Sequence, residues 1–131
     1  MPVSASSTSL RLAPETTASL ACRASRKEVL DALTGIGVRD LFPVVVGAED
    51  YAHGKPSPEP YLEGLSRLGV GARRAIVFED ATPGIQAARA AGLKVIAIRA
   101  GNFAGYDLSE ADVVVDTLDE VGDDLCARLV A

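Results

Sequence analysis

Hydrophobic and polar positions follow two different periods along most of the chain. Short apolar runs, nearly free of charge, occupy residues 20–22, 42–46, 75–78, 94–98 and 113–115. Apolar positions at helical spacing occupy residues 26–36, 59–68, 82–91 and 118–130. The runs are typical of strands buried on both faces of a sheet, and the segments between them of amphipathic helices. Their alternation predicts an α/β fold in which helices cover both faces of a parallel sheet.

The first 18 residues do not share this pattern. Residues 1–18 are rich in Ser, Thr and Ala and show no sustained period, so we expect a loose tail, with an organelle transit segment as the open alternative. Within it, only Ser9–Ala13 alternates as a strand would. Residues 19–131 are expected to form one α/β core domain.

Composition and charge exclude several classes of protein. With 13 basic and 18 acidic residues among 131, the net charge of −5 provides no electrostatic footprint for nucleic acid. No apolar run approaches the roughly 18 residues that a membrane span needs. The 2 cysteines show no metal-binding spacing and no disulfide framework, which indicates a reducing, cytoplasmic environment.

Two adjacent carboxylates follow the apolar run at 75–78. Ligands of parallel α/β sheets lie at the carboxyl ends of the strands, where Glu79 and Asp80 are expected. Such a pair suits a hard cation such as Mg²⁺. The alternative is that Asp80 or Thr82 only caps the following helix.

Two further polar residues follow other predicted strands. Lys55 lies in a turn between Gly54 and Pro56, which would aim its ammonium at an anion; the alternative is an ordinary solvated lysine. Ser25 opens the first predicted helix, either as its N-cap or as an anion contact. We expect Lys55 and Asp80 to meet at one edge of the sheet.

These positions match a family pattern. The runs 54–61 (GKPSPEPY) and 77–92 (VFEDATPGIQAARAAG) closely resemble the haloacid dehalogenase (HAD) superfamily of hydrolases, most of all the branch with sugar-phosphate phosphatases and β-phosphoglucomutase. The resemblance implies a three-layer Rossmann-like core and Mg²⁺-dependent phosphoryl transfer from small phosphorylated metabolites. It implies that Lys55 neutralises the nucleophile and the phosphate, and that Asp80 holds Mg²⁺ with Glu79 assisting. It also suggests a phosphate contact near Ser25, although the best gapless match puts Arg23 there.

The chain also departs from this pattern. The family's first strand leads into Asp-x-Asp-Gly-Thr, which supplies the nucleophile and the general acid/base, and this motif is absent, as is the cap domain that selects the substrate. We therefore expect a truncated HAD core that is inactive alone. A non-catalytic phosphate- or partner-binding domain remains open. A receiver-like phosphorylation domain is the third alternative. It is less favoured because receiver domains have their acidic pair early in the chain and their lysine last, whereas Lys55 here precedes Glu79 and Asp80.

The absent motif also has a structural consequence. The family's first strand is central, so its loss would leave a gap between the strands at 20–22 and 75–78. We expect Ser9–Ala13 to fill the gap, or the two edges to pair directly. Unpaired edges would also favour self-association.

Overall fold

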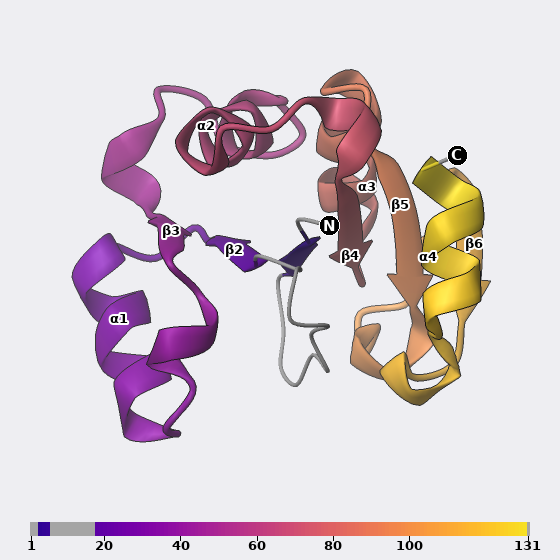
Figure 1. Ribbon diagram of the computed structural model, residues 1–131, viewed down its shortest axis with the longest axis horizontal. Coiled ribbons are helices and arrows are strands. Elements are labelled where there is room, and N and C mark those ends of the chain that lie inside the picture. The colour runs from indigo at the N-terminus through magenta and orange to yellow at the C-terminus, as the bar shows by residue number, and fades with distance from the viewer. Residues whose placement is uncertain (1–2, 6–17, 131) are drawn as a thin grey trace.

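The computed structural model describes residues 3–5 and 18–130, which form a six-stranded sheet between two layers of helices (Figure 1). The strands are β1 (Val3–Ala5), β2 (Ala18–Ala21), β3 (Val44–Val46), β4 (Ile76–Glu79), β5 (Lys94–Ile98) and β6 (Val113–Val115). The α-helices are α1 (Arg26–Gly35), α2 (Glu59–Leu68), α3 (Thr82–Ala90) and α4 (Asp123–Val130). No helix in this part of the chain is both long and apolar enough to span a membrane.

All neighbouring strands of the sheet are parallel, in the order β3-β2-β1-β4-β5-β6. The predicted α/β class with a parallel sheet is therefore confirmed. The register pairs the last residue of β2 with that of β3, Ala21 with Val46, and the last residue of β5 with that of β6, Ile98 with Val115. The carboxyl ends of the strands thus share one edge, where the following loops gather.

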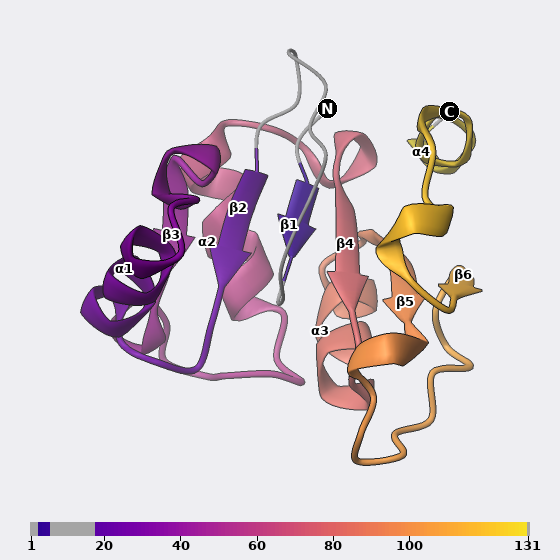
Figure 2. The same ribbon diagram turned by 90° about the horizontal axis from the view of Figure 1, so that it is seen from below.

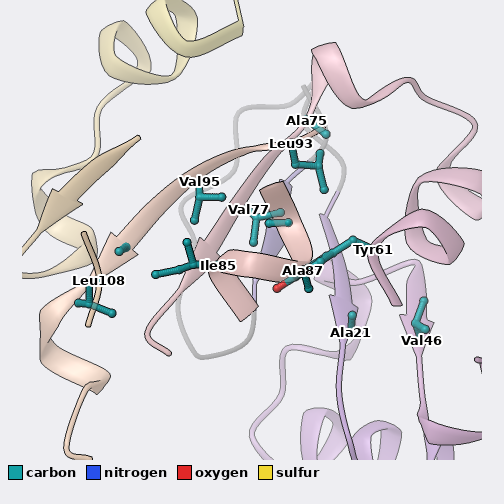
Figure 3. Close-up of a cluster of buried hydrophobic side chains, with 12 residues drawn as sticks. Ala21, Val46, Tyr61, Ala75, Val77, Ile85, Ala87, Leu93, Val95 and Leu108 are labelled. Atoms are coloured by element: carbon teal, nitrogen blue, oxygen red, sulfur yellow. The ribbon is translucent and has the colours of Figure 1, made fainter. Parts of the chain in front are cut away.

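The helices cover the two faces of the sheet unequally. On one face, α2 and α3 pack over a continuous apolar cluster that includes Val46, Val77, Ile85 and Val95 (Figure 3). On the other face, α1 and α4 lie toward opposite ends of the sheet (Figures 1 and 2) and cover separate apolar clusters. The sheet is thereby buried from both sides, as its predominantly apolar strands require.

The central place in the sheet is filled, in contrast to the expected loss of the first strand. It is taken by Val3–Ala5, which pairs with β2 and with β4. This strand falls within the segment expected to be a loose tail, and Ser9–Ala13, the predicted occupant, lies outside the described residues. Because both inner edges pair with β1, the gap that suggested self-association is closed.

The last predicted helix, residues 118–130, is divided in two. Leu118–Glu120 forms a 3₁₀ turn closed by a capping box between Thr117 and Glu120. Val121 is extended, with φ −90° and ψ 111°, and α4 begins only after Gly122. The apolar spacing runs through this break, whereas the Glu120 carboxylate accepts from the backbone N–H groups of Asp116 (2.5 Å) and Thr117 (2.9 Å) and so caps the amino end of the short turn.

Candidate functional site

The acidic pair lies at the carboxyl end of β4, the strand next to β1. Ala75 and Val77 face the α2–α3 layer, so the alternation of side chains along the strand turns Glu79 toward the same layer. Glu79 is 3% exposed, whereas Asp80, just beyond the strand, is half-buried. A carboxylate buried this completely needs partners that stabilise its charge.

Two glycines make room for the two carboxylates. A Cβ added to Gly84, in the first turn of α3, would lie 2.0 Å from the carboxyl carbon of Glu79. One added to Gly101 would lie 2.3 Å from Oδ2 of Asp80. Glu79 therefore packs directly against the amino-terminal turn of α3, where the helix dipole favours negative charge.

The charge partner of Glu79 is Lys55, which follows β3 in the chain. Its Nζ donates a hydrogen bond to Oε1 of Glu79 at 2.6 Å, and the lysine side chain is 13% exposed. The loop before Lys55 is fixed because Glu59 accepts hydrogen bonds from the backbone N–H groups of Ala52 (2.9 Å) and His53 (2.8 Å). Lys55 is therefore held by Glu79 and largely buried, and the alternative of an ordinary solvated lysine is wrong.

Tyr61, to which the sequence analysis gave no role, completes the arrangement. It extends from α2 toward β4 and α3 (Figure 3), and its hydroxyl donates to the same Oε1 of Glu79. Its ring centroid lies 4.9 Å from Nζ of Lys55. Burial and the charge of Glu79 hold the pKa of Tyr61 well above its usual range, so the phenol keeps its proton and donates. The only feature of the sequence that could have singled out Tyr61 is its place at the end of the run 54–61.

Asp80 lies beside this cluster but, unlike Glu79, forms no ion pair with a lysine or arginine among the described residues. Burial and the neighbouring Glu79 raise the pKa of Asp80, and Lys55 acts in the opposite direction. Among the described residues, no basic side chain forms a salt bridge with it. The alternative in which Asp80 or Thr82 only caps α3 is wrong, because the N-cap position holds Ala81 without a side-chain hydrogen bond. The hydroxyl of Thr82 instead donates to the carbonyl of Asp107 at 2.7 Å.

Ser25 takes the structural role that was one of its two alternatives. Its Oγ accepts a hydrogen bond from the backbone N–H of Glu28 at 3.2 Å, and the Glu28 carboxylate accepts one from the backbone N–H of Ser25 at 2.9 Å, which is a capping box. Its phosphate contact stays a prediction. Cys22, the residue just after β2, interacts electrostatically with Lys55, and burial raises the pKa of its thiol.

The donor set around Asp80 is small but suits a hard cation. Within residues 3–5 and 18–130, no three His, Cys, Asp or Glu side chains are grouped so as to hold a metal ion. Mg²⁺, however, is commonly held by one or two carboxylates together with water and a substrate phosphate. Asp80, with no basic partner among the described residues, fits such a site. Both oxygens of Glu79 have partners: Oε1 accepts from Lys55 and Tyr61, and Oε2 accepts from the backbone N–H of Asp80 at 3.3 Å.

Comparison with known proteins identifies the class that this fold and site define. A sequence model of the haloacid dehalogenase-like hydrolases matches residues 14–98, which include Lys55, Glu79 and Asp80. The chain belongs to this family, as the resemblance of its two sequence runs predicted.

Two phosphatases and one crystal structure illustrate which members of the family this chain is similar to. Validoxylamine A 7′-phosphate phosphatase of Streptomyces hygroscopicus subsp. limoneus is 43% identical over 90 residues, 69% of this chain and 42% of that protein. Fructose-1-phosphate phosphatase YqaB of Escherichia coli is 45% identical over 67 residues, 51% of this chain and 36% of that protein. The crystal structure of CbbY from Rhodobacter sphaeroides in complex with phosphate superposes with a TM-score of 0.75 at 29% identity, covering 82% of this chain and 49% of that one. The chain thus spans less than half the length of these relatives.

Proposed function

We propose that this chain provides the phosphate- and Mg²⁺-binding part of a phosphohydrolase that acts on small phosphorylated metabolites of the sugar-phosphate type. The observation that carries the proposal is the convergence of Lys55, Glu79 and Asp80 at the carboxyl edge of one sheet. The names of the relatives, a validoxylamine phosphate phosphatase and a fructose-1-phosphate phosphatase, support the substrate class.

Each residue has a role that follows from its surroundings. Lys55 presents a fixed positive charge to a phosphoryl oxygen, and Glu79 holds that ammonium in place. Asp80 is the principal ligand of Mg²⁺, which, when bound, would neutralise charge on the phosphate. Asp80 begins the turn into α3, so its carboxylate lies at the edge where the phosphate would enter.

Catalysis by these residues alone is not expected. Phosphoryl transfer through a covalent aspartyl-phosphate needs a carboxylate aligned with the phosphorus atom. The 131 residues contain no Asp-x-Asp sequence, and residues 1–14, which include β1, contain no carboxylate side chain. This favours the second candidate function, a phosphate-binding domain without turnover of its own.

Binding of inorganic phosphate, measured by calorimetry with and without Mg²⁺, tests the proposal. We expect binding that needs Mg²⁺ and that Asp80→Asn abolishes. Asp31→Asn is the matched control, because it makes the same change of charge at a side chain that is 67% exposed and lies on α1. Equal phosphate affinity in wild type and Asp80→Asn would contradict the proposal.

Hydrolysis of an aryl phosphate with Mg²⁺ tests whether the chain has turnover of its own. We expect that this chain binds phosphate when Mg²⁺ is present but does not hydrolyse the aryl phosphate. Turnover that Asp80→Asn abolishes would instead refute the non-catalytic candidate and show that another group in the chain acts as the nucleophile.

A further inference from the structure

Tyr61 links the two charged groups of the site without being charged itself. It is 3% exposed, its hydroxyl donates to Oε1 of Glu79, and the same oxygen accepts the ammonium of Lys55 at 2.6 Å. The lysine Nζ also lies 4.9 Å from the centroid of the tyrosine ring. Two donors from the run 54–61 therefore meet at one carboxylate oxygen at the end of β4.

Packing alone does not require this hydroxyl. The ring belongs to the apolar cluster beneath α2 and α3, where a phenylalanine would fill nearly the same volume (Figure 3). A buried phenol needs an acceptor, and this one uses the group that also anchors the lysine. The ring face meanwhile attracts the ammonium, because a cation is stabilised over an aromatic quadrupole.

We propose that Tyr61 is a positioning residue: it holds Glu79 and Lys55 in a fixed geometry so that the lysine ammonium meets the phosphoryl group in one orientation. The ammonium is then held from two directions, by the carboxylate and by the ring, and the lysine side chain stays 13% exposed. The link to phosphate rests on the proposed function, whereas the restraint on Lys55 does not.

Chemical labelling measures the restraint directly, because the chain has only three lysines: Lys27, Lys55 and Lys94. The side chains of Lys27 and Lys94 are 84% and 52% exposed and serve as internal references. Acetylation by N-hydroxysuccinimidyl acetate is followed by mass spectrometry in wild type, Tyr61→Phe and Tyr61→Leu. We expect Tyr61→Phe to raise the rate at Lys55, relative to the references, about fivefold, since a hydrogen bond that fixes its partner is lost. Tyr61→Leu, which also removes the ring face, is expected to raise it further.

Phosphate affinity measures the consequence. In the presence of Mg²⁺, Tyr61→Phe is expected to weaken the binding of inorganic phosphate about fivefold, because the ammonium is no longer held in one geometry. A purely structural role would lower the melting temperature of Tyr61→Phe while leaving both the acetylation ratio and the phosphate affinity of the folded protein unchanged. That result would overturn the inference.

The two measurements also separate this inference from the function on which it partly rests. If the wild type does not bind phosphate, the proposed function fails, and the acetylation ratio still decides whether Tyr61 positions Lys55. If Tyr61→Leu does not fold, Tyr61→Phe decides alone, since it keeps the ring in the core. An unchanged ratio in Tyr61→Phe overturns the inference in either case.

Discussion

Replacing Lys55 by Met is expected to lower the free energy of unfolding by about 3 kcal/mol. The ammonium lies 2.6 Å from a carboxylate that is 3% exposed, so its removal leaves a buried charge less compensated. Breaking a buried ion pair costs roughly 3–5 kcal/mol, and the hydroxyl of Tyr61, still on the same oxygen, places the expected loss at the lower end. Met retains most of the apolar stem of the lysine, so the loss is mainly electrostatic.

Urea unfolding at neutral pH, followed by circular dichroism, tests this prediction with a double-mutant cycle. The variants are Lys55→Met, Glu79→Gln and the two combined. We expect the combined variant to be more stable than Lys55→Met alone, because its site contains no uncompensated carboxylate. The control Lys94→Met removes a lysine that is 52% exposed and should cost at most about 0.5 kcal/mol. Strict additivity of the two single changes, or a Lys55→Met loss no larger than the control's, would refute the reasoning.

Three further predictions concern other side chains. Ser25→Ala should lower the free energy of unfolding by about 1 kcal/mol, because α1 loses its N-cap. Phosphate calorimetry on the same variant tests the predicted phosphate contact of Ser25, and an unchanged affinity would show that Ser25 serves only as the cap. Asp50→Asn should lower the free energy of unfolding by about 2 kcal/mol at pH 7, because Asp50 accepts hydrogen bonds from two arginines. These arginines hold the pKa of Asp50 well below its ordinary value. In urea unfolding, the extra stability of the wild type over the variant should therefore shrink as the pH falls below about 4. Asp80→Asn should raise the melting temperature at pH 7, since burial and Glu79 raise the pKa of Asp80 and its ionised form is disfavoured in the folded state; a lower melting temperature would contradict this.

Elements with a strong local signal could be predicted from the sequence. The strands at 94–98 and 113–115 and the helix at 59–68 have the predicted bounds in the structure. Both strands are β-branched runs, and Gly69, with φ +72°, ends the helix in a left-handed conformation that glycine adopts without strain. Local pattern and tertiary packing agree in these segments.

The central strand could not be predicted in this way. Val3–Ala5 has only three residues, too few for the alternation of Val3 and Ala5 around Ser4 to mark a strand. Its conformation depends on pairing with β2 and β4, partners that follow it at distances a local pattern cannot encode. Strand formation is set by such context more than by intrinsic preference, and Ser9–Ala13 showed the stronger local pattern.

The residues of the candidate site likewise differ in how far the sequence alone could indicate them. Loop position and residue type indicated Lys55, Glu79 and Asp80, because functional side chains gather at the carboxyl ends of parallel strands. Tyr61 gave no such signal, since an aromatic residue on an amphipathic helix is typical of a core position. Its hydroxyl contact joins residues 18 apart in sequence, and only the fold reveals it.

The charges at the site determine what it can bind. Among Lys55, Glu79 and Asp80, the ammonium is balanced by Glu79 at 2.6 Å, and the carboxylate of Asp80 is in excess. A phosphate dianion that approaches Lys55 therefore meets a net negative cluster, in which Coulomb repulsion at short range opposes the attraction of the lysine. A divalent cation bound at Asp80, as proposed, would reverse the sign of the cluster. For this reason phosphate affinity should depend on Mg²⁺ first and on the orientation of Lys55 second.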